Sequence, residues 1–274
     1  MGKPRLTDAA RPATFEVEAY NEAGEMVPTA IAGEHPLTLY LDKREIVTLM
    51  TLGHAPEALV IGYLRNQRLV DSIGDIASVQ VDWDTGSAAV VTSKQKHIDL
   101  EKKTVTSGCG QGTMFGNLME EIDQVQLRED VFLEDTNLFA LIEKVRRHET
   151  IYKQAGAVHG CALATLGGEI LMFVEDVGRH NAVDAIAGFM WLDAIDGSDK
   201  VFYTTGRLTS EMVIKCAQMR IPFLVSRSGL TQMGHEIARK VGITMLGRAS
   251  GRHYLAFSGR ERLKRTSPHR TALA

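Results

Sequence analysis

The chain has 274 residues, of which 44% are hydrophobic and 24% charged, and its formal net charge is -3. That length suffices for one large domain or two smaller ones, and the charge balance gives no indication of general nucleic-acid binding. No stretch approaches the ~18 consecutive apolar residues of a membrane span, and the first residues contain no apolar segment typical of a signal peptide. We therefore expect a soluble protein that acts without nucleic acid or membrane.

The three cysteines, Cys109, Cys161 and Cys216, are an odd and sparse set. Such a set argues against a disulfide framework and favours a reducing, cytoplasmic location. Cys161 falls in a predicted strand and Cys216 on a predicted helix face, where a thiol is usually a packing group.

The first half of the chain predicts a small α+β domain at residues 14–105, preceded by a polar, proline-containing segment, 1–13, that we expect to be disordered. The domain's predicted elements are a strand at 35–42, a helix at 55–67 with Pro56 near its start, and strands at 76–83 and 87–93 that flank a hairpin turn.

The run "SGCGQGTMFG", residues 107–116, places Cys109 between Gly108 and Gly110 in a stretch that predicts neither helix nor strand. Glycine gives a mobile backbone that other groups can approach closely. Two interpretations stay open here: a flexible linker that contains a thiol, or a thiol carried on a mobile loop. With the acidic stretch that follows, this loop forms a predicted connector at 106–134.

The second half, residues 135–264, alternates between helical and strand patterns and predicts a three-layer α/β domain with parallel strands. Residues 265–274 are expected to be a disordered tail. The predicted elements are a helix at 136–149, two strands within 158–176 joined at Gly167-Gly168, a helix at 181–194, strands at 200–206, 221–228 and 243–248, and helices at 209–220 and 231–242.

Three strand-to-loop turns carry the candidate binding residues, since ligands of α/β sheets bind beyond the carboxyl ends of the strands. The first turn, "EDVGRHN", gathers five polar groups where one helix cap would suffice. The second, "TTGRLTSEM", sets Gly206 and Arg207 before a helix N-terminus that Thr209 or Ser210 can cap, an anion site in principle. The third, "GRASGR", puts Arg248 and Arg252 on a predicted tight turn, where a phosphate site and a solvated turn are equal alternatives.

His159 stands at a predicted strand start, on the same side as Cys161 by the alternation of strand side chains. It is either a pocket histidine or a satisfied core histidine. A zinc site is not expected, because the chain lacks the H-x-E and P-C-x-x-C signature of zinc deaminases. It also has no second pair of ligands at metal spacing beside His159 and Cys161.

The motifs "SGCG", "GAVHGCAL", "EDVGRHNAVD", "TTGRLTSEMV" and "LGRASGR" occur together in this chain, with "LMTLGHAPEALVIGYLRNQRLVDSIGDI" in its first half. Together they resemble the FdhD family of formate dehydrogenase accessory sulfurtransferases over most of residues 30–264. The pair "EDVGRHNAVD" and G-R-x-x-S-E-M-V is highly specific.

The resemblance implies a protein that accepts sulfur from a cysteine desulfurase as a persulfide on Cys109. It would pass the sulfur to the molybdenum (or tungsten) bis-molybdopterin guanine dinucleotide cofactor before insertion into formate dehydrogenase. It further implies a C-terminal domain similar to cytidine deaminase, without zinc ligands, and a homodimer. In this interpretation the loop lowers the pKa of the Cys109 thiol through backbone N–H groups and the nearby Lys102 and Lys103.

The resemblance also assigns residues to the bound nucleotide, with Arg207, Arg248 and Arg252 on its phosphates. The predicted cofactor-binding residues are His159, Glu175, Asp176, Arg179, His180, Asn181, Gly206, Arg207, Ser210, Gly247, Arg248, Gly251 and Arg252.

The chain departs from the family pattern at one position. The family typically carries C-x-x-C in the loop, and here Gly112 replaces the second cysteine. One thiol suffices to hold a sulfane sulfur, so sulfur transfer is the leading hypothesis. The alternative is a non-catalytic chaperone that binds the cofactor and docks onto the apoenzyme.

Overall fold

The computed structural model describes residues 3–93, 104–105, 112–113, 122, 125–148 and 150–266. Contacts divide the chain into two units, each built from separate stretches of sequence. The first comprises Met1–Gln124, Glu149–Cys161 and Phe173–Ile195, and the second Val125–His148, Ala162–Met172 and Asp196–Ala274. The contiguous domains predicted at 14–105 and 135–264 differ from these units, because periodicity along a sequence does not show which distant segments pack together.

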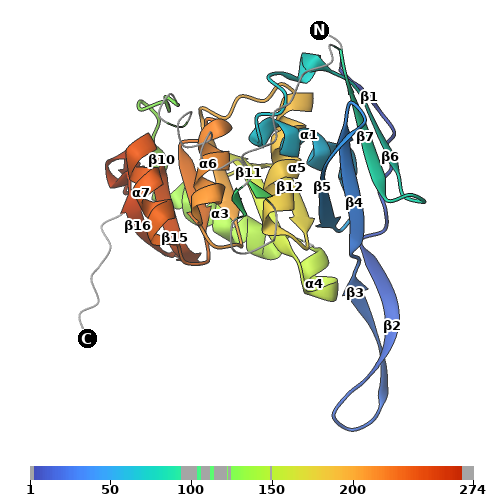
Figure 1. The fold of residues 1–274 in the computed structure, drawn as a ribbon. Helices are drawn as coiled ribbons and strands as arrows, with labels where there is room; N and C mark the ends of the chain where they lie inside the picture. The colour runs from blue at the N-terminus through green and yellow to red at the C-terminus, as the bar shows by residue number, and fades with distance from the viewer. Residues whose placement is uncertain are drawn as a thin grey trace. The chain divides into compact units, whose positions relative to one another are not determined.

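A five-stranded sheet in the order β1-β6-β7-β4-β5 forms much of the first unit (Figure 1). Its strands are β1 (Arg5–Leu6), β4 (His35–Leu41), β5 (Arg44–Thr51), β6 (Ile76–Asp82) and β7 (Ser87–Thr92). In β4 the leucines at alternate positions are fully buried, so one sheet face contributes to the core. The predicted strand at 35–42 and the hairpin of β6 and β7 are confirmed.

The N-terminal segment departs from the predicted disorder. β1 pairs in parallel with β6, the indole N–H of Trp83 donates to the carbonyl of Ala9 at 2.6 Å, and the N–H of Arg11 donates to the carbonyl of Gly53 at 2.8 Å. Residues 3–13 are therefore fixed by tertiary hydrogen bonds, although their polar, proline-containing sequence has no regular pattern of its own.

A separate two-stranded antiparallel hairpin joins β2 (Thr14–Tyr20) to β3 (Met26–Ala32). It runs away from β4 as a narrow ribbon in Figure 1. The carboxamide oxygen of Asn21 accepts from the N–H groups of Ala23 and Glu25 in its turn, and Gly24 takes a φ of 78°. The hairpin is not among the predicted elements, because Pro28 disfavours a strand assignment.

Two helices of the first unit cross at very close range. α1 (Pro56–Asn66) confirms the predicted helix with Pro56 at its first position, and α5 (Arg179–Leu192) begins two residues before its predicted start. A Cβ atom on Gly62 would lie 1.6 Å from the carbonyl oxygen of Asp184, and one on Gly188 would lie 1.9 Å from that of Ala58. The two glycines are therefore required by the backbone contact between the helices.

The second sheet has the order β12-β11-β13-β14-β15-β16. Its strands are β11 (His159–Thr165), β12 (Ile170–Asp176), β13 (Lys200–Thr204), β14 (Phe223–Ser226), β15 (Thr244–Ser250) and β16 (His253–Ser258). β13, β14 and β15 pair in parallel, and β16 closes the edge antiparallel to β15. A mixed α/β architecture with parallel strands is thus confirmed, and β16 is an additional strand.

The helices of residues 135–241 that were predicted from their apolar spacing also match their predicted positions. They are α3 (Asp135–Arg147), α6 (Ser210–Gln218) and α7 (Gln232–Val241), with the short α4 (Ile151–Ala155) between α3 and β11. α3 buries Leu138, Leu141, Ile142 and Val145 on one face, and α7 ends at Gly242, whose φ is 76°.

Short elements complete the described part. β10 (Leu133–Glu134) pairs with β17 (Leu263–Lys264) after a turn of 3-10 helix at Arg260–Arg262, and another such turn spans Ile73–Asp75. β8 (Thr104–Val105) pairs with β9 (Gly112–Thr113), so two residues of the glycine run that predicts no strand do form one. Cys109 and the residues after Thr266 lie outside the described residues.

Within the described ranges, no helix is both long enough and apolar enough to cross a membrane.

Candidate functional site

The turn between β12 and α5, where the sequence predicts a binding site, is held by the carboxylate of Asp176. Its Oδ1 accepts from the N–H of Gly178 at 2.9 Å and the Asn181 amide at 2.8 Å. Its Oδ2 accepts from the Thr51 hydroxyl at 2.6 Å and the N–H of Leu52 at 3.1 Å. Burial raises the pKa of Asp176, against these four donors, which lower it. One buried side chain therefore joins the end of β5 to the start of α5.

Two neighbouring side chains complete this frame. Asn181 also donates to the carbonyl of Met50 at 2.7 Å. Glu175 accepts from the N–H groups of Ile151 and Tyr152 at 2.6 and 3.2 Å, and so caps the first turn of α4. The partners in these hydrogen bonds are groups of the chain itself. Glu175, Asp176 and Asn181 therefore have a structural role in holding the turn.

The remaining predicted residues of the first unit lie beside this frame. Arg179 and His180 are buried in the first turn of α5. His159 is half-buried at the start of β11. The structure thus places all six predicted residues of this unit at the ends of β11 and β12 or the start of α5.

In the second unit, the loops after β13 and β14 are hydrogen-bonded to each other, and the loop after β14 is also bonded to Arg248 of β15. The Ser226 hydroxyl donates to the carbonyl of Gly206 at 2.6 Å, and the N–H of Leu208 donates to the carbonyl of Gly229 at 3.0 Å. The N–H of Arg248 donates to the carbonyl of Ser228 at 2.9 Å. The predicted turns at 204–212 and 247–252 are therefore linked through the loop after β14.

Basic side chains extend from these linked segments. Arg207 and Arg248 are exposed, and Arg248 has a φ of 52°. Arg227 is exposed on the loop after β14. It is not among the predicted residues, although, like Arg207 after β13, it lies just beyond the carboxyl end of a parallel strand. Applying the strand-end rule to β14 would have identified it.

The start of α6 differs from its prediction. Thr209 is the residue before the helix, but its side chain makes no capping hydrogen bond, and its Oγ1 is buried without a hydrogen-bond partner. Ser210 is the first helical residue and half-buried. The first N–H groups of a helix have no partner within the helix, and the Thr209 side chain does not accept a hydrogen bond from them here.

The third predicted turn is also corrected. Gly247 and Arg248 belong to β15, which continues to Ser250 with a register shift against β16. A Cβ atom on Gly247 would lie 2.9 Å from the ring of Phe257. The tight turn is shorter than predicted and contains Gly251 and Arg252, both exposed.

A hollow of about 900 Å³ lies along β16 and the residues that follow it. Its lining residues are Arg252, His253, Tyr254, Leu255, Ala256, Arg260, Glu261, Leu263 and Arg265. Burial and the charge of Asp135 raise the pKa of Tyr254. Of the predicted phosphate-binding arginines, Arg252 is the one that lines this hollow.

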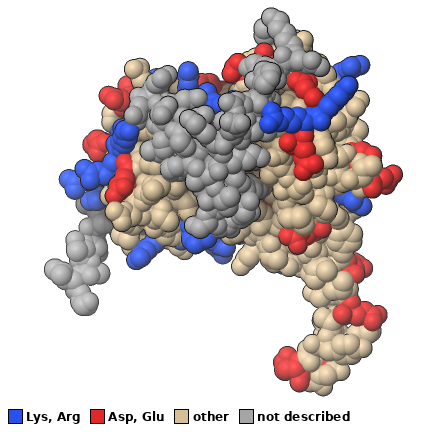
Figure 2. All heavy atoms as spheres, viewed as in Figure 1, with Lys and Arg blue, Asp and Glu red and all other residues tan. Residues whose placement is uncertain are grey.

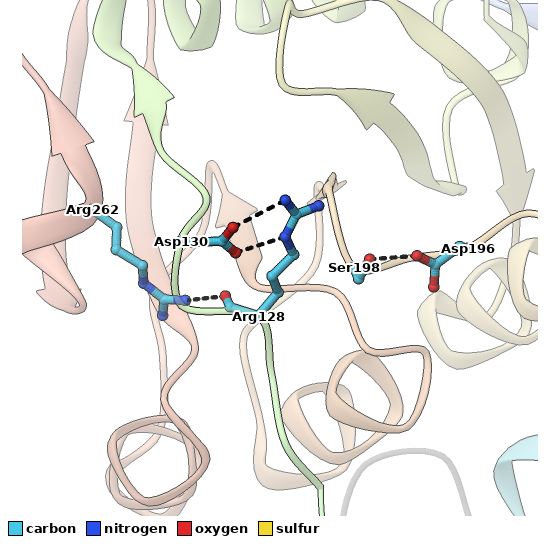
Figure 3. Close-up of polar contacts among 5 residues, drawn as sticks. All are labelled: Arg128, Asp130, Asp196, Ser198 and Arg262. Atoms are coloured by element: carbon cyan, nitrogen blue, oxygen red, sulfur yellow. Dashed lines mark hydrogen bonds and ion pairs between the residues drawn. The ribbon is translucent and has the colours of Figure 1, made fainter.

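Another polar cluster of the second unit is structural. Figure 3 shows Arg128 in a two-bond contact with Asp130. Arg262 donates to the carbonyl of Arg128 at 3.3 Å and to that of Gly242. Its guanidinium lies over the ring of Phe223, and burial lowers its pKa. Arg262 therefore ties the segment before β10 to the end of α7.

The cysteines separate into two groups. Cys161 and Cys216 have no exposed surface, which confirms them as packing residues, and neither forms a disulfide bond. Cys109, the predicted sulfur carrier, lies outside the described residues. Among the described side chains, no group of three His, Cys, Asp or Glu residues could hold a metal ion.

Comparisons with known proteins agree with the motifs. The model of the FdhD/NarQ family matches residues 32–264. A relative named sulfur carrier protein FdhD, from Listeria innocua, is 31% identical over 254 residues, which cover 91% of this chain and 95% of the relative. A relative of the same name from Wolinella succinogenes is 31% identical over 222 residues, with 80% and 77% of the two chains covered.

A solved structure is similar in fold as well. The crystal structure of a formate dehydrogenase accessory protein from Desulfotalea psychrophila aligns with a TM-score of 0.75 at 26% identity. The alignment covers 92% of this chain and 100% of that one. The family model spans most of the sequence and the Listeria innocua relative is 31% identical over 91% of it, and so this chain belongs to the FdhD/NarQ family.

Proposed function

We propose that this protein is a sulfurtransferase for formate dehydrogenase maturation in the cytoplasm. It accepts sulfur from a cysteine desulfurase on Cys109 and passes it to the molybdenum or tungsten bis-molybdopterin guanine dinucleotide cofactor, its substrate. The observation that carries the assignment of Cys109 is the complete burial of Cys161 and Cys216. A thiolate must reach a donor protein to react, and neither buried thiol can do so.

The loading step needs no oxidant or reductant. The Cys109 thiolate attacks the outer sulfur of the donor's persulfide, the donor's S–S bond breaks, and the donor cysteine leaves as a thiolate. The product is a persulfide on Cys109. Because one thiol is sufficient for this exchange, Gly112 in place of a second cysteine does not prevent it.

The linked segments of the second unit would bind the guanine nucleotide of the cofactor. Arg207, Arg248 and Arg252 supply cations, and the start of α6 at Ser210 supplies N–H groups that Thr209 does not cap. Gly251 is exposed with open space beside it and would allow close approach of the nucleotide, whereas the buried Gly206 and Gly247 would shape the backbone on which the arginines stand. In the first unit, Asp176, Asn181 and Glu175 would position the turn that carries Arg179 and His180, with His159 beside it.

Further features of the proposal follow the family resemblance. The second sheet and its helices would form a cytidine deaminase-like domain without zinc, and two chains would form a homodimer. The mixed sheet order of β12 to β16 supports the first of these.

Mass spectrometry of the intact protein tests the sulfur-carrier role. Incubation with a cysteine desulfurase and cysteine should add one sulfur atom to the wild type and none to Cys109→Ala, whereas Cys216→Ala should load like the wild type. Loading that persists in Cys109→Ala would contradict the assignment. A wild type that binds nucleotide and never loads sulfur would favour the alternative, a cofactor chaperone in which Gly112 marks the lost step.

Calorimetry with GDP tests the nucleotide site separately. Each charge-assisted contact is worth about 1.5–3 kcal/mol, so Arg207→Ala should weaken binding by at least about tenfold. Arg239→Ala, an exposed arginine in the last turn of α7, is the matched control and should bind normally. Equal affinities for Arg207→Ala and wild type would remove Arg207 from the site.

A further inference from the structure

The strand β16 forms one edge of the second sheet (Figure 1), and among the described residues β15 is its sole strand partner. An edge strand presents a row of backbone N–H and C=O groups with which another chain can pair. Proteins usually block such an edge with proline or charged side chains, yet β16 contains no proline, glycine, lysine, arginine or acidic residue. Its composition therefore suits the addition of a further strand.

The hollow of about 900 Å³ follows this edge. Successive side chains of a strand point to opposite faces, so a cavity on one face would contact every second residue. Here the consecutive residues from Arg252 to Ala256 all line the hollow, which places it beside the strand and not above one face. Ligand pockets have volumes of about 300–1,000 Å³, and this hollow lies at the upper end of that range.

The open part of the edge ends at a bulge. The register pairs Ala256 and Ser258 with consecutive residues of β15, so Phe257 is an extra residue of β16. The carbonyl oxygen of Phe257 lies 3.0 Å from Nε2 of His235 on α7 and is thus already occupied. The remaining residues, His253–Ala256, span about 14 Å at the rise of an antiparallel strand. The edge therefore offers pairing to a segment of about four residues.

Positive charge surrounds the hollow. Arg252 precedes β16, whereas Arg260 and Arg265 follow it, and all three side chains are exposed. Glu261 is the one acidic residue among the described residues that line the hollow. Figure 2 shows lysine and arginine side chains, with some acidic ones, on the side of the second unit where Figure 1 draws β16. A guanidinium binds a carboxylate through two parallel hydrogen bonds, so the hollow favours a segment that carries aspartate or glutamate.

A protein segment fits this edge better than a nucleic acid does. Single-stranded nucleic acids bind where bases stack on exposed aromatic rings, but Tyr254 of the hollow is half-buried. Its ring packs beside that of Phe139 on α3, with the centroids 6.0 Å apart. A nucleic acid also lacks the regularly spaced backbone amides that pair with an edge strand. An acidic peptide can use both the arginines and the backbone of β16.

We propose that the open edge of β16 binds an extended acidic segment of a partner protein. The segment adds to the second sheet as a further strand, and its carboxylates contact Arg260 and Arg265. Backbone hydrogen bonds to His253–Ala256 provide affinity, and the arginines select acidic side chains. The proposal does not depend on the sulfur-carrier function, because Arg260 and Arg265 belong neither to the Cys109 loop nor to the proposed nucleotide site.

Fluorescence anisotropy with the full-length protein tests the charge requirement. The probe is a labelled Glu-Val-Glu-Val-Glu-Val peptide with both ends blocked, and its binding should weaken as salt is added. Arg260→Gln with Arg265→Gln should weaken binding at least about tenfold, since hydrogen bonds to charged groups are lost. Arg239→Gln with Lys240→Gln is the matched control. It removes the same charge from the exposed end of α7 and should change affinity less than about twofold.

A second peptide tests the strand pairing. A peptide of the same sequence with every backbone nitrogen methylated keeps its carboxylates but cannot donate backbone hydrogen bonds. It should bind the wild type at least about tenfold more weakly than the unmethylated peptide, because strand addition relies on main-chain hydrogen bonds. Equal affinities for the two peptides would show that the hollow attracts acidic chains without adding a strand, and would overturn the proposal.

Other outcomes would also overturn it. These are equal binding by wild type and Arg260→Gln with Arg265→Gln, or no binding of the acidic peptide to the wild type at low salt. Displacement of the peptide by GDP would make the hollow part of the nucleotide site. Tighter binding of a single-stranded oligonucleotide that requires the same two arginines would make it a nucleic-acid site.

Discussion

In the first unit, one buried carboxylate holds segments that are distant in the sequence together by hydrogen bonds. The Asp176 carboxylate accepts four hydrogen bonds from three separate positions of the chain: the end of β5, Gly178 and Asn181. Burial of a carboxylate is costly unless its oxygens are fully hydrogen-bonded, and here both oxygens are. The motif that contains Asp176 is therefore needed for the shape of the turn, whatever ligand that turn binds.

Asp176→Asn should destabilise the protein by about 2–4 kcal/mol, because an amide N–H₂ would face donors and leave buried groups unpaired. Asp193→Asn, at the exposed end of α5, removes only a surface ion pair with Lys3 and should change stability by less than about 0.5 kcal/mol. Denaturant unfolding of both variants measures the difference. Equal stability of Asp176→Asn and wild type would show that the four hydrogen bonds contribute nothing net.

At the scale of elements, α1 and α5 pack with their backbones in contact. Asn66 donates to the Asp184 carboxylate at 2.7 Å, and Arg65 donates to the carbonyl of Ala187 at 2.8 Å. These bonds form only because Gly62 and Gly188 have no side chains to separate the helices. The glycines look unfavourable in a helix by propensity alone, by ~1 kcal/mol each relative to alanine, and packing reverses that preference.

Gly62→Ala and Gly188→Ala should each destabilise the protein by about 3 kcal/mol or more, since a methyl group at 1.6 or 1.9 Å from a backbone oxygen forces the helices apart. Gly229→Ala is the matched control, because a Cβ there meets no atom within 4 Å. Thermal unfolding monitored by circular dichroism compares the three. A stabilised Gly62→Ala would mean that the close crossing does not exist.

For the whole molecule, the distribution of thiols separates folding from function. Cys161 in β11 and Cys216 in α6 have no exposed surface, so each is a packing group whose reaction requires the protein to open. Thiol reactivity depends on exposure and on the thiolate fraction. Cysteine chemistry in the native protein should therefore report on one position.

Ellman's reagent should titrate one thiol in the native protein and three in guanidinium chloride, because Cys161 and Cys216 become accessible only on unfolding. Cys109→Ser should react with none in the native state and keep wild-type stability. Rapid native-state labelling of Cys161 or Cys216, identified by peptide mass analysis, would contradict this expectation.

Local pattern alone determined most of the secondary structure. The leucine and valine spacing of α3, Pro56 at the start of α1 and the left-handed Gly242 at the end of α7 are properties of consecutive residues, so they could be predicted. The sequence motifs also identified the family, because several short, specific patterns occur together.

Only the tertiary structure decided how distant residues meet. No local rule places Thr51 against Asp176, or Gly62 against Asp184, because each pair is separated by more than a hundred residues. The same applies to residues 3–13, whose order comes from partners such as Gly53 and Trp83. Periodicity predicts which side of an element is apolar, and only packing decides which distant segment covers that side.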